Sequence, residues 1–241
     1  MAINKEVLKT RSLTALIFVA VMLLGLFYNK WSFIILFTII HFGCWYEFII
    51  LMKKINGDKY LPYCFLSLVY ITMPILMLYH LGVILSASPI NLYSIDLANA
   101  HRVNIDFSAL IPAAVIFSIW INDTMAYIVG SLIGKTPFSK ISPKKTWEGT
   151  AGGAILCVSV IGLLGYFVTV AKQIAVLHWF AIAAICAIFG TAGDLLESKI
   201  KRMADVKDSG SFMPGHGGFL DRFDSLLVAT PFVWLYAKLF I

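Results

Sequence analysis

The stretch from Ser198 to Ser225 gathers lysines, arginines, aspartates, glycines and a histidine between two apolar runs. Asp221 and Asp224 are three positions apart, as are Asp194 and Glu197 just before the stretch, so on a helix each pair faces one side. Clustered carboxylates suit Mg²⁺, which takes one or two of them and completes its shell with water and substrate phosphates. Acidic residues can also simply complement a helix dipole, but that alternative does not cover Asp194 and Glu197, at the other type of helix end.

A glycine-rich turn precedes the last apolar run. His216, Gly217 and Gly218 would lead into a helix N-terminus, where backbone N–H groups can bind phosphate oxygens. The alternative is a turn with a hydrogen-bonded structural histidine. Lys207 and Arg222 flank this turn and are candidates for anion binding, although basic residues at a membrane edge are usually anchors.

A second polar stretch, residues 141–153, reads ISPKKTWEGTAGG. The Ser142–Pro143 pair predicts a helix N-cap with proline in the first turn. Gly149 and Gly153 form a GxxxG pair, which predicts close helix packing. The Lys144–Lys145 pair is a candidate for polyphosphate binding, either paired with Glu148 or left available to a ligand.

The elements that position these residues are membrane helices. Hydrophobic residues make up 60% of the chain and charged residues 13%, and the mean hydropathy is +0.86, which indicates an integral membrane protein. Apolar runs of about 20 residues recur along nearly the whole chain and leave no separate soluble domain. The four cysteines are scattered singly inside these runs and predict neither a disulfide framework nor a metal site.

The predicted fold is all-α, a polytopic bundle of about seven transmembrane helices, within a range of six to nine. Pro74 leaves open whether the third run is one kinked helix or two short ones, and Asn122 with Asp123 suggests a break in the fourth. The predicted spans are 12–27, 31–52, 61–85, 107–130, 149–171, 174–196 and 219–240.

This arrangement gives a strong asymmetry of charge. With the N-terminus in the cytoplasm, all but four of the 19 lysines and arginines fall on the cytoplasmic side, the exceptions being Lys30, Arg102, Lys172 and Lys238. The net charge of +6 therefore suits anionic lipid or an anionic substrate, and nucleic acid is not expected as a partner. The polar connection 86–106 lies on the far side. Five carboxylates come to one depth near the cytoplasmic side: Asp123, Asp194, Glu197, Asp221 and Asp224.

These residues resemble a known family, the phosphatidate cytidylyltransferases or CDP-diacylglycerol synthases. Its signature of S, K-R, K-D, H-G-G, D-R and D occurs here as Ser198, Lys201, Arg202, Lys207, Asp208, His216, Gly217, Gly218, Asp221, Arg222 and Asp224. The stretch from Asn122 to Gly153 is similar to a second block of that family. The resemblance divides a single membrane domain, 1–241, into N-terminal helices (1–106) and a catalytic half (107–241) with cytoplasmic loops 131–148 and 197–218.

The resemblance implies a reaction of CTP with phosphatidic acid that gives CDP-diacylglycerol and pyrophosphate, with Mg²⁺ as cofactor and room for a monovalent cation such as K⁺. Asp194 and Asp221 are the leading metal ligands, with Asp224 beside them. The catalytic set implied is Lys207, Asp208, His216, Asp221, Arg222 and Asp224. The substrate-binding set implied is Asp123, Lys144, Lys145, Ser198, Lys201, Arg202, Gly217 and Gly218.

Two other functions stay open at this point. An ion-coupled transporter of an anionic solute would use the carboxylates as a cation path. A CTP-dependent polyprenol or lipid kinase would transfer the γ-phosphoryl group and release CDP. The expected location is the bacterial cytoplasmic (inner) membrane, with the active site facing the cytoplasm. Pairs of small residues such as Gly162/Gly165 and Gly190/Gly193 permit a homodimer without requiring one.

Overall fold

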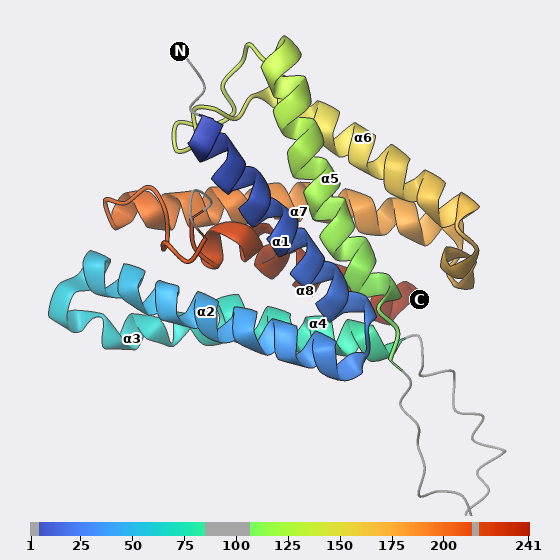
Figure 1. The fold of residues 1–241 in the computed structure, drawn as a ribbon, viewed down its shortest axis with the longest axis horizontal. Helices are drawn as coiled ribbons and strands as arrows, with labels where there is room; N and C mark the ends of the chain where they lie inside the picture. Colours follow the sequence, from blue (N-terminus) through green and yellow to red (C-terminus); the bar gives the residue numbers. More distant parts are fainter. Residues whose placement is uncertain (1–4, 85–106, 214–216) are drawn as a thin grey trace, which may run out of the picture.

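The structure is a computed structural model that describes residues 5–84, 107–213 and 217–241. These residues form helices and the connections between them, and apart from two isolated β-bridges they contain no strand, which confirms the all-α prediction (Figure 1). The helices are α1 (Lys5–Phe27), α2 (Lys30–Asn56), η1 (Gly57–Lys59), α3 (Leu61–Cys64), η2 (Leu68–Thr72), α4 (Met73–Ile84), α5 (Leu110–Ile133), α6 (Trp147–Phe167), η4 (Thr169–Gln173), α7 (Val176–Met203) and α8 (Leu220–Phe240). The predicted far-side connection 86–106, with Arg102, and the predicted site residue His216 lie outside the described residues.

Six helical segments among the described residues are long and apolar enough to cross a membrane: Lys30–Lys59, Leu61–Val83, Leu110–Ile133, Trp147–Phe167, Val176–Met203 and Leu220–Phe240. They correspond to six of the seven predicted spans. The remaining predicted span, 12–27, lies within α1, where Ser12–Phe27 is a shorter apolar segment. The polytopic membrane fold is therefore confirmed, with six segments of full spanning length among the described residues.

One open alternative is resolved, and two helices differ from their predicted form. The third span is nearly continuous and takes up Pro74 by a π-helical turn, Leu68–Thr72, directly before it. A wider turn relieves the clash of a proline ring with the preceding turn of backbone. The predicted break at Asn122 is wrong, because α5 is continuous through it. α7 continues to Met203, so the first residues of the predicted loop 197–218 are helical.

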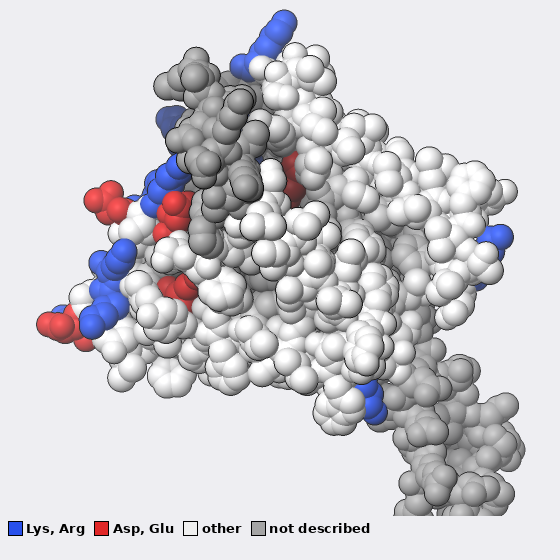
Figure 2. Space-filling model, in the orientation of Figure 1, with Lys and Arg blue, Asp and Glu red and all other residues white. Residues whose placement is uncertain are grey.

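The C-terminal helices form the closest-packed part of the bundle. α5 packs along α6, α6 along α7 and α7 along α8, while α4 packs on α8 and α1 on α2. α2, α5 and α7 all end on the same side of the molecule, where α6 and α8 begin (Figure 1). In the view of Figure 2, acidic and basic side chains gather mainly at this polar end, and few lie elsewhere.

Glycines bring α5 and α6 into contact, as the GxxxG pair predicts. A Cβ added to Gly153 would lie 2.7 Å from the Cβ of Ala126 and 2.8 Å from the carbonyl oxygen of Asn122. Gly149 is held as closely, with Gly130 opposite. Such contacts let two backbones approach where lipid provides no hydrophobic driving force between helices.

We predict that Gly153→Ala lowers stability by about 1–3 kcal/mol, because the added methyl group overpacks the α5–α6 contact. Gly190→Ala is the matched control, since its added Cβ would meet nothing closer than 3.5 Å. The measurement is the midpoint of thermal unfolding of the purified protein in detergent. Equal midpoints for the two variants would contradict this account of the contact.

Candidate active site

A cavity of about 600 Å³ opens between α5, α6, α7 and α8 at the polar end of the bundle. Its wall contains most of the predicted site residues: Asp123, Lys144, Lys145, Asp194, Lys201, Asp208, Asp221, Arg222 and Asp224. Asn122 and Glu197 also line it. The structure therefore brings residues from 122 to 224 to one place, with basic and acidic groups on the same surface.

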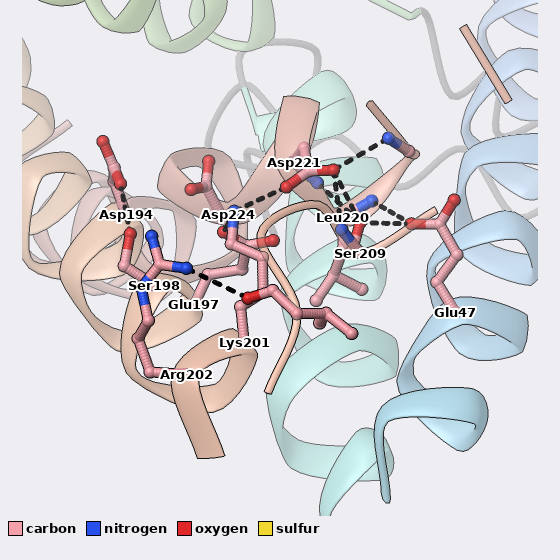
Figure 3. Close-up of polar contacts among 12 residues, drawn as sticks. Glu47, Asp194, Glu197, Ser198, Lys201, Arg202, Ser209, Leu220, Asp221 and Asp224 are labelled. Atoms are coloured by element: carbon pink, nitrogen blue, oxygen red, sulfur yellow. Dashed lines mark hydrogen bonds and ion pairs between the residues drawn. The ribbon is translucent and has the colours of Figure 1, made fainter. Parts of the chain in front are cut away.

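Lys201 is the central cation of this wall. Its ammonium group forms ion pairs with Glu197, one turn earlier on α7, and with Oδ1 of Asp221 on α8, at 2.5 Å. Glu197 is fully buried (0% exposed), so its charge requires a partner inside the protein. The Lys201 side chain thus joins α7 to α8 and compensates two carboxylates (Figure 3).

Asp221 is occupied by donors of the protein. Its Oδ2 accepts hydrogen bonds from the backbone N–H groups of Gly218 (2.8 Å) and Ser209 (2.9 Å), and it lies 3.0 Å from the Ser209 hydroxyl oxygen. Gly217 has a positive φ of 82°, and a Cβ there would collide with the Asp221 carboxylate. With Lys201 on Oδ1, this carboxylate holds the connection before α8 in shape.

Asp194 and Asp224 form the acidic part of the wall. Oδ1 of Asp194 accepts a hydrogen bond from Ser198 (3.2 Å), and Oδ2 forms an ion pair with Lys145. Asp224 is 8% exposed, and its carboxylate lies within electrostatic reach of Asp194 and Asp123. The helices approach closely here, since a Cβ on Gly193 of α7 would lie 2.5 Å from the backbone oxygen of Asp224.

The α5–α6 connection holds two lysines at the cavity. Glu148 accepts hydrogen bonds from the backbone N–H groups of Lys135 and Thr136, so it fixes this connection and does not pair with the Lys144–Lys145 pair. The predicted N-cap at Ser142–Pro143 is wrong: α6 begins at Trp147. Its cap is Thr146, whose hydroxyl accepts from the Gly149 N–H (3.1 Å).

Five predicted residues are not among those that line the cavity in the described part of the chain: Ser198, Arg202, Lys207, Gly217 and Gly218. Ser198 supports Asp194, and Arg202 donates to the backbone oxygen of Val206 (3.1 Å), which closes the end of α7. The Gly218 N–H donates to Asp221. Ser198, Arg202 and Gly218 therefore support the backbone and side chains of the cavity wall without lining it. Lys207 is exposed.

Glu47 of α2 is a polar residue that the sequence interpretation missed. It is 4% exposed, and its carboxylate accepts hydrogen bonds from the Ser209 hydroxyl (2.7 Å) and from the backbone N–H groups of Phe219 (2.8 Å) and Leu220 (2.9 Å). Figure 3 shows it reaching from α2 towards the start of α8. A signal was available, because an acidic residue within an apolar span usually has a function.

Comparison with known proteins agrees with the sequence signature. A model of the cytidylyltransferase family matches residues 76–240, which include every described residue that lines the cavity. The chain belongs to the cytidylyltransferase family. The match covers more than half of the chain.

Several curated proteins of the family are similar to this chain. The phosphatidate cytidylyltransferase of Bacillus subtilis (strain 168) is 40% identical over 150 residues, 61% of this chain and 53% of the relative. That of Aquifex aeolicus (strain VF5) is 43% identical over 121 residues, 50% of this chain and 44% of the relative. Phosphatidate cytidylyltransferase 4, chloroplastic, of Arabidopsis thaliana is 43% identical over 119 residues, which are 48% of this chain and 29% of the relative. The chain spans about half the length, or less, of these relatives.

We predict that Lys201→Met destabilises the protein by about 3–5 kcal/mol, because it leaves the buried Glu197 charge without its partner. Lys199→Met is the matched control, an exposed lysine on the same helix. Adding Glu197→Gln to Lys201→Met removes the unpaired charge and is expected to restore part of the loss. Thermal unfolding in detergent measures all three, and equal midpoints for Lys201→Met and Lys199→Met would refute the role of the ion pairs.

Proposed function

We propose that this protein transfers the cytidylyl group of CTP to phosphatidic acid, which gives CDP-diacylglycerol and pyrophosphate. The observation that carries the proposal is a cavity at the polar end of a membrane bundle in which lysines and an arginine face a cluster of aspartates. Both substrates are anions, so such a site must offset their repulsion and align them. The names of the relatives support the same reaction.

The proposed reaction does not require a general base. A phosphomonoester has a second pKa of about 6, so phosphatidic acid is largely dianionic at neutral pH. Its phosphate oxygen attacks the α-phosphorus of CTP, a new P–O bond forms, the bond between the α-phosphorus and the bridging oxygen breaks, and pyrophosphate leaves with its electron pair. Lys144, Lys145 and Arg222 bind phosphate oxygens and stabilise the negative charge of the leaving group.

The acidic wall fits Mg²⁺. The described residues contain no group of three or more Asp, Glu, His or Cys side chains placed to hold a metal ion alone. Mg²⁺ needs fewer protein ligands, because it keeps water and substrate phosphates in its shell. We assign Asp194 and Asp224 as the ligands. Asp221 is bound by Lys201 and by two backbone N–H groups that belong to the fold, whereas Asp194 contacts only the side chains of Ser198 and Lys145. When bound, Mg²⁺ would link these carboxylates to nucleotide phosphates and offset their charge.

The orientation follows from charge. The polar end that contains the cavity carries the excess of lysine and arginine, so it faces the cytoplasm of a bacterial cell if the positive-inside bias sets the topology. CTP then reaches the cavity from the cytoplasm, and phosphatidic acid reaches it from the surrounding lipid. A monovalent cation such as K⁺ beside Mg²⁺ stays a prediction, tested by adding it to the assay below.

The test is transfer of label from α-³²P-CTP into chloroform-extractable lipid by the purified protein in detergent with phosphatidic acid. We expect lipid label and pyrophosphate release that both require Mg²⁺. A kinase would release CDP and leave the α-label in water, and a transporter would need a sealed bilayer. Either result would overturn the proposal.

We further predict that Asp194→Asn lowers the rate of cytidylyl transfer at least about 100-fold. The substitution removes a proposed Mg²⁺ ligand, and the cation would offset the negative charge that develops on the phosphates in the transition state. Asp58→Asn, an exposed carboxylate on η1, is the control and is expected to stay within twofold of the unaltered protein. Size-exclusion profiles establish that both variants are folded. Near-normal activity of Asp194→Asn would contradict its assignment as a metal ligand.

A further inference from the structure

We infer that Glu47 of α2 is a positioning residue for the reaction in the cavity: its carboxylate fixes the start of α8, at Phe219 and Leu220, and Ser209 in the connection before it. The inference rests on the proposed function, because the groups it places are those assigned to cytidylyl transfer. Glu47 is not among the described residues that line the cavity, and it precedes the stretch 76–240 that matches the family. It therefore acts through other residues.

The Glu47 carboxylate caps the N-terminus of α8. The first N–H groups of a helix have no partner within the helix and need an acceptor. Phe219 precedes α8 and supplies no side-chain cap. The Glu47 carboxylate takes that place from another helix, with Oε1 accepting from the Phe219 N–H and Oε2 from the Leu220 N–H. A negative charge at this end of α8 is also stabilised by the helix dipole.

The Glu47 carboxylate is buried, with 4% of the residue exposed. A carboxylate within an apolar bundle is costly unless it is compensated. Glu47 receives three hydrogen bonds, from Ser209, Phe219 and Leu220, and all three donors belong to the segment that leads into the cavity wall. The free energy of burying this charge is thus offset only while that segment keeps its present position. α2 and the start of α8 are coupled for this reason.

The backbone at Gly210 and Gly218 lies close to the Glu47 carboxylate. A Cβ added to Gly218 would collide with both oxygens of Glu47, and one added to Gly210 would collide with Oε1. The chain therefore passes close to the carboxylate on both sides of residues 211–217, and glycine at these two positions makes that approach sterically possible. Such a fit limits the movement of α8 relative to α2.

Ser209 connects Glu47 to Asp221 at the cavity. The Ser209 hydroxyl lies between two carboxylates, 2.7 Å from Oε2 of Glu47 and 3.0 Å from Oδ2 of Asp221. Asp221 in turn binds Lys201 in the cavity wall. A shift of the α8 start would therefore move Asp221 and, with it, Arg222 and Asp224. Displacement of reacting groups by about 1 Å can cost about 100-fold in rate.

The experiment compares Glu47→Gln, Glu47→Ala and the control Asp58→Asn, each purified in detergent. We expect kcat for cytidylyl transfer to fall about 10-fold for Glu47→Gln, which keeps the size and one acceptor oxygen, and about 100-fold for Glu47→Ala. KM for CTP is expected to change less than threefold, because the Lys144–Lys145 pair assigned to the phosphates lies on the α5–α6 connection, with which Glu47 makes no hydrogen bond among the described residues. Amide hydrogen exchange at Phe219 and Leu220 should accelerate about 10-fold in Glu47→Ala, as expected for loss of one net hydrogen bond each.

The outcomes separate the alternatives. A purely structural role predicts a lower unfolding midpoint with kcat per folded molecule unchanged, and that result would overturn the inference. Unchanged exchange at residues 219 and 220 in a folded Glu47 variant would overturn it as well. If the unaltered protein transfers no cytidylyl group, the proposed function fails, while the exchange measurement still decides whether Glu47 holds the start of α8.

Discussion

The site depends on mutual compensation of charges inside a bundle that is otherwise apolar. Lys201 forms ion pairs with both Glu197 and Asp221, and Glu47 and Asp221 together bind Ser209 and backbone N–H groups at the start of α8. Because a buried charge without a partner is costly, each group restricts where its partner can lie. The positions of α2, α7 and α8 at the polar end follow from these contacts.

The remaining helices supply access and close approach. Glycines on α6 allow α5 to come near, so Asp123 on α5 reaches the same cavity as Asp194 on α7. The α5–α6 connection, fixed by Glu148, holds Lys145 against Asp194. The resulting surface carries both signs of charge, which suits a reaction in which two anions are aligned and a third departs.

Much of this arrangement could be predicted from the sequence, because apolar runs of spanning length and a dense polar signature are local patterns. Glu47 is an acidic residue in an apolar run, but its role could not be predicted because its partners lie more than 160 residues away in the sequence. The misplaced cap at Ser142 has a similar reason. Serine followed by proline is a common helix start, but here Glu148 draws the chain into a turn and Thr146 caps the helix four residues later.

The most direct measurement is a cryo-electron microscopy structure of the protein in lipid nanodiscs with CTP and Mg²⁺. The account predicts triphosphate density in the cavity, between the Lys144–Lys145 pair and Arg222, with a metal ion against Asp194. Triphosphate bound elsewhere on the polar end, for example at the Lys53–Lys54 pair, with the cavity free of nucleotide, would contradict it.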